Sequence, residues 1–196
     1  MEQRQRKSQL NLVVGINGTG KTTFVRNEVL PRFQKALVLT PDDMEWRHLP
    51  TLDSGNLAQE VYNLTGHARV IYKGPETMET VIRYYSGGVL VLDDAMAYLG
   101  FQTSETMRYL YIRRRQRGVD IYLVAHGLRQ VPVQAFTFGS YLILFASTEN
   151  FSARKRDLQP DTYERIEQAQ RELGEECRKN PYTHRVITLD PQLKQS

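Results

Sequence analysis

The chain has 196 residues with 40% hydrophobic and 24% charged side chains and a formal net charge of +4, a combination typical of a soluble globular protein of one domain. Its longest apolar runs, at 89–92 and 141–146, are far shorter than the ~20 residues of a membrane-spanning helix, so no transmembrane segment is expected. The basic start of the chain lacks the apolar stretch of a signal peptide, and the single cysteine, Cys177, excludes an internal disulfide, so we expect a cytoplasmic protein.

The apolar pattern predicts an α/β fold. Short apolar runs typical of buried strands lie at 10–14, 36–39, 68–72, 88–92, 120–125, 141–146 and 186–189. Helical patterns lie between them at 22–30, 76–85, 104–116 and 160–179, and Pro31 is expected to end the first helix. Strands alternating with helices predict a central, mostly parallel sheet flanked by helices on both faces. We expect one domain over 10–196 after a basic tail at 1–9, with 44–66 mostly a loop.

A phosphate-binding loop is predicted where the first strand runs into glycines. The run from Gly15 to Thr22 fits the pattern G-x-x-x-x-G-K-S/T, whose backbone N–H groups turn inward toward phosphate oxygens. The start of the following helix adds its positive dipole end. We expect Lys21 to reach the β- and γ-phosphates of ATP or GTP, and Thr22 to offer its hydroxyl to Mg²⁺. The predicted nucleotide-binding residues are Gly15, Ile16, Asn17, Gly18, Thr19, Gly20, Lys21, Thr22 and Thr23.

Two adjacent carboxylates follow the most strand-like run of the chain. Asp93 and Asp94 come directly after 88–92, at the strand end where ligands of open α/β sheets gather. Asp93 is the predicted Mg²⁺ ligand, and Asp94 is predicted to orient and help deprotonate the attacking water. The alternative is a pair that caps the next turn. Adjacent carboxylates repel each other unless a cation lies nearby, which favours the metal site.

Two further features supply candidate site residues. His126 ends the strand at 120–125, where it could touch the γ-phosphate or the attacking water, or have only a structural role. A run without acidic residues carries Arg108, Arg113, Arg114, Arg115 and Arg117. Such clusters bind nucleic-acid phosphates, contact nucleotide phosphates at a subunit boundary, or form a solvated basic face.

The order of these motifs resembles the FtsK–HerA superfamily of DNA-pumping ATPases. Within it, the chain is most similar to the small genome-packaging ATPases of membrane-containing icosahedral viruses. The resemblance covers most of 10–190 and rests on 15–22, 90–94, 115–126 and 132–145. The chain has His126 where the family usually has Gln, and Asp94 where it usually has Glu; both replacements keep hydrogen-bonding capacity.

The resemblance implies an ATP-driven motor that pumps double-stranded DNA into a capsid, without sequence preference and with Mg²⁺. It implies a homo-oligomer, most simply a hexameric ring, in which Arg115 is the arginine finger inserted into the neighbouring subunit's site. Arg113, Arg114 and Arg117 are rivals for this role, or contacts to DNA phosphates. Capsid or portal-vertex proteins are implied partners, and the implied location is the host cytoplasm or the virion.

Other functions stay open at this stage. A filamentous-phage assembly ATPase usually carries a membrane anchor, which we do not expect here. A nucleoside or nucleotide kinase would need an arginine-rich lid, which the run 113–117 could imitate. A P-loop protein could also bind nucleotide only to regulate assembly, whereas a GTPase is disfavoured because no Asn-Lys-x-Asp motif occurs. Trp46, Tyr62 and His67 could line an adenine pocket or contact the next subunit, but they are expected simply to pack.

Overall fold

The computed structural model describes residues 8–99, 105–190 and 193, and its centre is a seven-stranded sheet in the order β3-β2-β4-β5-β1-β6-β7. Every neighbouring pair is parallel except β6 and β7, which are antiparallel. The prediction of a mostly parallel α/β sheet is therefore confirmed. The strands are β1 (Leu10–Val14), β2 (Ala36–Thr40), β3 (His67–Ile71), β4 (Gly88–Leu92), β5 (Val119–Ala125), β6 (Tyr141–Phe145) and β7 (His184–Thr188).

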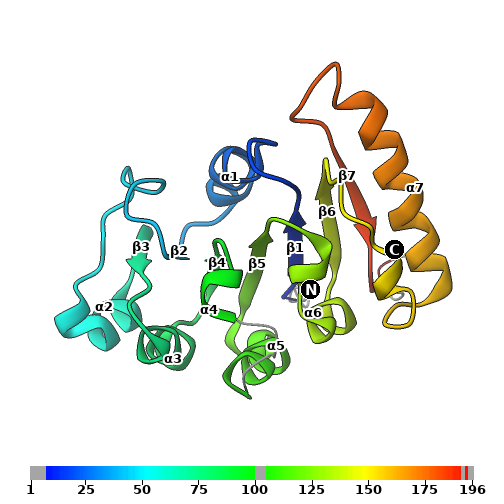
Figure 1. Cartoon of the computed structure of the whole chain (residues 1–196). Coiled ribbons are helices and arrows are strands. Elements are labelled where there is room, and N and C mark those ends of the chain that lie inside the picture. The colour runs from blue at the N-terminus through cyan, green and yellow to red at the C-terminus, as the bar shows by residue number, and fades with distance from the viewer. Residues whose placement is uncertain (1–7, 100–104, 191–192, 194–196) are drawn as a thin grey trace, which may run out of the picture.

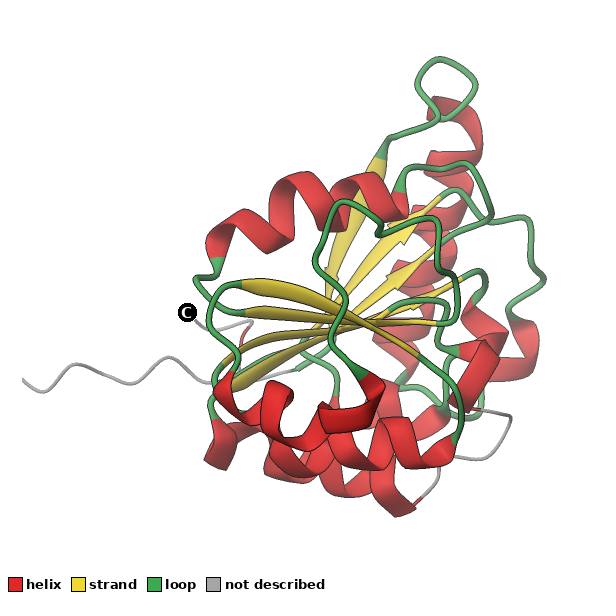
Figure 2. Ribbon diagram, turned by 90° about the vertical axis from the view of Figure 1, so that its left-hand side faces the viewer, coloured by secondary structure: helices red, strands yellow, loops and turns green. Residues whose placement is uncertain are grey.

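Helices cover both faces of this sheet (Figures 1 and 2). The α-helices are α1 (Lys21–Phe24), α2 (Leu57–Asn63), α3 (Pro75–Tyr84), α4 (Met96–Leu99), α5 (Glu105–Arg117), α6 (Val133–Phe138) and α7 (Pro160–Glu176). Short 3₁₀ helices lie at Ser54–Asn56, Leu128–Gln130 and Ser152–Arg154. Within the described residues, no helix has the length and apolar character needed to cross a membrane.

The hydrophobic core lies in two layers, one on each face of the sheet. Strand residues alternate between them: in β1, Leu12 belongs to one buried cluster and Val13 to the other, as the two-residue period of a strand requires. The thicker layer includes side chains of α2, α3, α5, α6 and α7. The thinner layer is closed by Val25 and Val29 after α1, together with Trp46.

The first helical stretch differs from its prediction. It begins at Lys21, changes to a π-helix at Val25–Val29 and continues as a 3₁₀ helix at Leu30–Arg32. Pro31 therefore does not end it, because a proline near the start of the new 3₁₀ turn loses no hydrogen bond that the turn needs.

The prediction of a loop over 44–66 is wrong in part. The Asp53 side chain accepts a hydrogen bond from the Gly55 N–H at 3.0 Å and starts a 3₁₀ turn that leads into α2. Leu57 and Val61 of α2, four residues apart, are both buried against the core. This i,i+4 pair was the local signal for the helix.

The sheet order brings three strand ends together. β5 lies between β1 and β4, so the loop after β1, the carboxylates after β4 and His126 after β5 share one edge of the sheet. Residues 1–7 of the predicted basic tail, and Ser104 at the predicted start of a helix, lie outside the described residues.

Candidate nucleotide-binding site

The glycine loop joins β1 to α1 in the conformation that a phosphate cradle needs. Gly18 and Gly20 have φ of 78° and 90°, in the left-handed region that glycine adopts without steric cost. The loop is fixed at its base, where the Gly15 N–H donates to the Ala125 carbonyl at 3.3 Å and the Ile16 N–H donates to the Ala146 carbonyl at 2.9 Å. No side chain caps the start of α1, so its first N–H groups can serve an anion.

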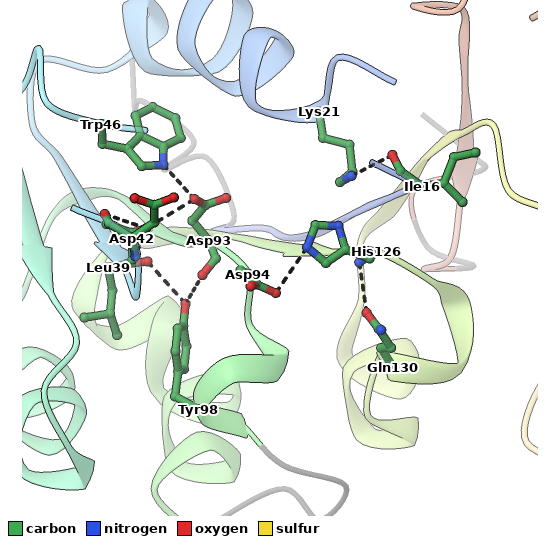
Figure 3. A network of polar contacts seen from close by, with 11 residues as sticks. Ile16, Lys21, Leu39, Asp42, Trp46, Asp93, Asp94, Tyr98, His126 and Gln130 are labelled. Atoms are coloured by element: carbon green, nitrogen blue, oxygen red, sulfur yellow. Dashed lines mark hydrogen bonds and ion pairs between the residues drawn. The ribbon is translucent and has the colours of Figure 1, made fainter. Parts of the chain in front are cut away.

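Lys21 is buried and folds back over its own loop. Its Nζ donates to the Ile16 carbonyl at 3.0 Å (Figure 3). Burial lowers the pKa of Lys21, while the negative charges of Asp93, Glu45 and Asp94 act in the opposite direction. A buried ammonium group held by a carbonyl oxygen is a favourable partner for a phosphate that enters the loop.

Asp93 is a buried carboxylate with two donors on one oxygen. Its side chain is 4% exposed, and its Oδ2 accepts hydrogen bonds from Trp46 Nε1 at 2.7 Å and from Thr40 Oγ1 at 3.4 Å. The pKa of Asp93 is raised to about 6, mainly by burial and also by the charges of Glu45 and Asp94, whereas the two hydrogen bonds oppose the shift. A nearby cation would favour the ionised form.

Asp94 and His126 form a direct pair across the ends of β4 and β5. Asp94 Oδ1 lies 3.3 Å from His126 Nε2 (Figure 3). The two side chains are 40% and 38% exposed and both residues line the cavity. Asp94 has φ of 43°, a left-handed conformation that costs a non-glycine residue on the order of 1 kcal/mol. The His126 N–H donates to Gln130 Oε1 at 3.0 Å, which fixes the backbone beneath the pair.

These groups surround one cavity of about 530 Å³. Most of the predicted site residues line it: Asn17, Gly18, Gly20, Lys21, Thr22, Thr23, Asp93, Asp94 and His126. Gly15 and Ile16 anchor the loop instead, and Thr19 Oγ1 donates to the Ile16 carbonyl at 2.8 Å, which braces it. Sequence reasoning missed six residues that line the cavity: Thr40, Pro41, Asp42, Glu45, Val124 and Tyr182. It also missed the contact of Trp46 with Asp93.

The donor set fits Mg²⁺. Thr22 and Asp93 both line the cavity and carry hard oxygen ligands, and the raised pKa of Asp93 marks a charge that a cation would stabilise. Within the described ranges, no group of three or more His, Cys, Asp or Glu side chains could hold a metal. Mg²⁺ in nucleotide sites is bound by one or two protein oxygens together with phosphates and waters, so two ligands suffice.

The arginine run on α5 divides into tethered and exposed side chains. Arg114 is buried and donates to the carbonyls of Tyr111 and Phe138. Arg117 donates to carbonyls at the end of α3, those of Ile82, Arg83 and Tyr85. These bonds engage both guanidinium groups within their own chain.

Arg113 and Arg115 are exposed. The Arg113 guanidinium lies 4.4 Å from the Tyr109 ring centroid. Arg115 lies just before β5 begins at Val119, whereas the cavity lies beyond the end of β5. Arg115 therefore does not belong to the site of its own chain, and its role in a neighbouring site stays a prediction.

The sheet order, the glycine loop after β1 and the carboxylates after β4 define the fold of a P-loop NTPase. The genome packaging NTPase B204 from Sulfolobus turreted icosahedral virus 2 in complex with AMP is similar to this chain with a TM-score of 0.73, 12% identity and coverage of 94% of each chain. The same NTPase in complex with AMPPCP has a TM-score of 0.68 at 11% identity, over 81% of this chain and 86% of that one. No protein-family model and no curated protein matches the sequence. The predicted resemblance to viral packaging ATPases is thus confirmed as a shared fold.

Proposed function

We propose that the protein is a Mg²⁺-dependent ATPase that drives double-stranded DNA into a viral capsid. The observation that carries this proposal is the convergence of Lys21, Asp93 and the Asp94–His126 pair on one cavity beside a glycine loop. The shared fold with a viral genome-packaging NTPase supports the packaging role.

Each residue of the cavity has a distinct task in this proposal. Lys21 and the N–H groups of its loop bind the β- and γ-phosphates. Thr22 and Asp93 hold Mg²⁺, which neutralises phosphate charge when it is bound. Asp94 orients the attacking water and accepts its proton, and His126 holds the Asp94 carboxylate at the cavity wall.

We propose that the working form is a ring, most simply a homohexamer. An exposed Arg115, distant from the site of its own chain, is available to a neighbouring copy. There it would stabilise the charge that develops on the transferred phosphoryl group. The remaining exposed arginines of α5 would contact DNA phosphates, and capsid or portal-vertex proteins would hold the ring at the virion.

The test is ATP hydrolysis with Mg²⁺, measured as phosphate release with and without linear double-stranded DNA over a range of salt concentrations. We expect hydrolysis without any nucleoside acceptor, stimulation by DNA, and loss of that stimulation as salt rises, because phosphate contacts release counterions. Asp94→Asn should abolish turnover and keep ATP binding, because it removes the base but not the phosphate cradle.

Two results would redirect the assignment. ATP consumption only in the presence of a nucleoside or nucleotide acceptor would identify a kinase. ATP binding without any hydrolysis, together with normal assembly by Asp94→Asn, would identify a regulatory nucleotide-binding protein. Hydrolysis that is indifferent to DNA and to salt would contradict the translocase part of the proposal alone.

A further inference from the structure

An aromatic ring lies against the phosphate loop. Tyr182, in the turn between α7 and β7, lines the same cavity as Lys21 and is 61% exposed. Its contact with the loop is direct, since a Cβ atom added at Gly20 would come within 2.6 Å of Tyr182 Cδ1. Figure 1 shows the α7–β7 turn beside the loop that leads into α1. Much of the ring therefore remains free to meet a ligand in the cavity.

The turn that carries Tyr182 is held in place. Asn180 Oδ1 accepts a hydrogen bond from the Tyr182 N–H at 3.0 Å, and the Asn180 carbonyl accepts one from Thr183 Oγ1 at 3.0 Å. At the start of β7, the His184 ring packs 5.0 Å from the ring centroids of both Phe24 and Phe145. These contacts tie the turn to α1 and β6, so the backbone positions the Tyr182 ring over the loop.

The residues at the two ends of the cavity indicate how a bound nucleotide would be oriented in it. The carboxylates and His126 follow β4 and β5, whereas Tyr182 precedes β7, and β1 with its loop lies between them in the sheet order. A triphosphate bound with its terminal phosphate near Asp93 and Asp94 would thus have its other end toward the β6–β7 side. That end carries the nucleoside.

We propose that Tyr182 stacks on the base of the bound nucleoside triphosphate. Among the described residues that line the cavity, Tyr182 is the only phenylalanine, tyrosine or tryptophan. Stacking on an aromatic ring accepts any base, because every base has a π-face. This inference rests on the proposed nucleotide-binding function and adds the nucleoside end of the site to it.

The test separates the base from the phosphates. ATP and inorganic tripolyphosphate, each with Mg²⁺, are titrated calorimetrically into the wild-type protein, Tyr182→Ala and Tyr182→Phe. We expect Tyr182→Ala to weaken ATP binding on the order of tenfold and to leave tripolyphosphate binding unchanged. Tyr182→Phe should bind both ligands like the wild type, because stacking needs the ring and not the hydroxyl.

A matched control is Tyr62→Ala, which removes a ring that is 69% exposed on α2 and does not line the cavity. It should change neither affinity. Unchanged ATP binding by Tyr182→Ala, or equal weakening of both ligands, would overturn the stacking role. Tripolyphosphate binding by the wild-type protein would still support the proposed phosphate site in either case. If the wild-type protein bound neither ligand, the proposed function would fail first and the inference with it.

Discussion

The carboxyl ends and the amino ends of the central strands are flanked by charged residues of different kinds. At the carboxyl ends of the strands, Lys21, Asp93 and Asp94 line one cavity, so charges of both signs meet within one chain. At the amino ends, α5 carries a run of arginines, of which Arg114 is bound to its own chain and Arg115 is exposed. The comparison teaches that the residues of the candidate phosphate site come together within one chain, whereas Arg115 lies outside that site. Under the proposed function, Arg115 would act in the site of another copy.

The largest expected effect concerns Arg115. Arg115→Ala should lower ATP turnover by roughly 1,000-fold, the typical contribution of an arginine finger. It should leave ATP affinity unchanged, because the finger acts on charge that develops only in the transition state. Phosphate release and nucleotide titration measure the two quantities. Arg113→Ala is the matched control, since it removes an exposed arginine of the same helix.

Mixing two inactive variants sharpens this prediction. Lys21→Ala lacks the phosphate contact and Arg115→Ala lacks the finger, so mixed rings should contain some sites with both residues. Partial recovery of turnover supports an arginine supplied by a neighbour. Equal losses from Arg113→Ala and Arg115→Ala, with no recovery on mixing, would contradict it.

Arg114 should behave in the opposite way. Its removal leaves two carbonyl acceptors without their donor and opens a space beside α6, so Arg114→Ala should lower the free energy of unfolding by about 2–4 kcal/mol. Arg115→Ala should change it by less than about 0.5 kcal/mol, as is usual for an exposed residue. Urea unfolding of both variants measures the difference, and similar values for the two would remove the distinction.

The buried Asp93 carboxylate should lower the free energy of unfolding of the metal-free protein. The pKa of Asp93 in the fold is about 6, above its ordinary value of 3.8, so the folded state favours the protonated form. The ionised carboxylate therefore destabilises the metal-free protein above about pH 6, and this effect disappears below about pH 4. Asp93→Asn should raise the free energy of unfolding by about 1–3 kcal/mol near pH 8 and leave it nearly unchanged near pH 4.

The same substitution should abolish Mg²⁺-dependent ATP hydrolysis. Thermal unfolding in a chelator across this pH range, compared with phosphate release, measures both effects. Equal stability of the variant and the wild type at both pH values would show that burial does not strain the Asp93 carboxylate.

The smallest expected effect concerns Trp46, the only tryptophan of the chain. Trp46→Phe keeps most of the buried ring and removes the N–H that binds Asp93 Oδ2. Apparent Mg²⁺ affinity in the presence of an ATP analogue should weaken a few-fold, about 1 kcal/mol, because one donor that orients the carboxylate is lost. Wild-type tryptophan fluorescence should respond to Mg²⁺ with the analogue, and no response would place the metal away from Asp93.

The sequence allowed most of the fold, and most of the residues that line the candidate site, to be predicted. Each strand of the sheet was expected within one or two residues, because short apolar runs are bounded by glycine, proline or polar residues. The glycine loop was identified from its fixed positions and from the strand and helix around it. Asp93, Asp94 and His126 could be predicted because the ends of parallel strands share one edge of the sheet.

The remaining features depend on contacts between distant residues. Trp46 binds a carboxylate 47 positions away, and Tyr182 lies in a turn, where the sequence has no helix or strand periodicity. Neither residue therefore has a local sequence signal for its role. Arg114, by contrast, stands three residues after Tyr111 and four after Leu110, which are both buried in the core. Helical spacing therefore indicated that Arg114, and not Arg115, lies on the buried face of α5.

The most direct test of the central claim is a calorimetric titration of Mg²⁺ with a non-hydrolysable ATP analogue into the wild-type protein and Lys21→Ala. Lys73→Ala serves as the control, because Lys73 bonds to Ser54 and does not line the cavity. We predict one site per wild-type chain, an affinity at least about 100-fold lower in Lys21→Ala, and no change in Lys73→Ala. Equal binding by wild type and Lys21→Ala would contradict the claim that this loop holds the phosphates.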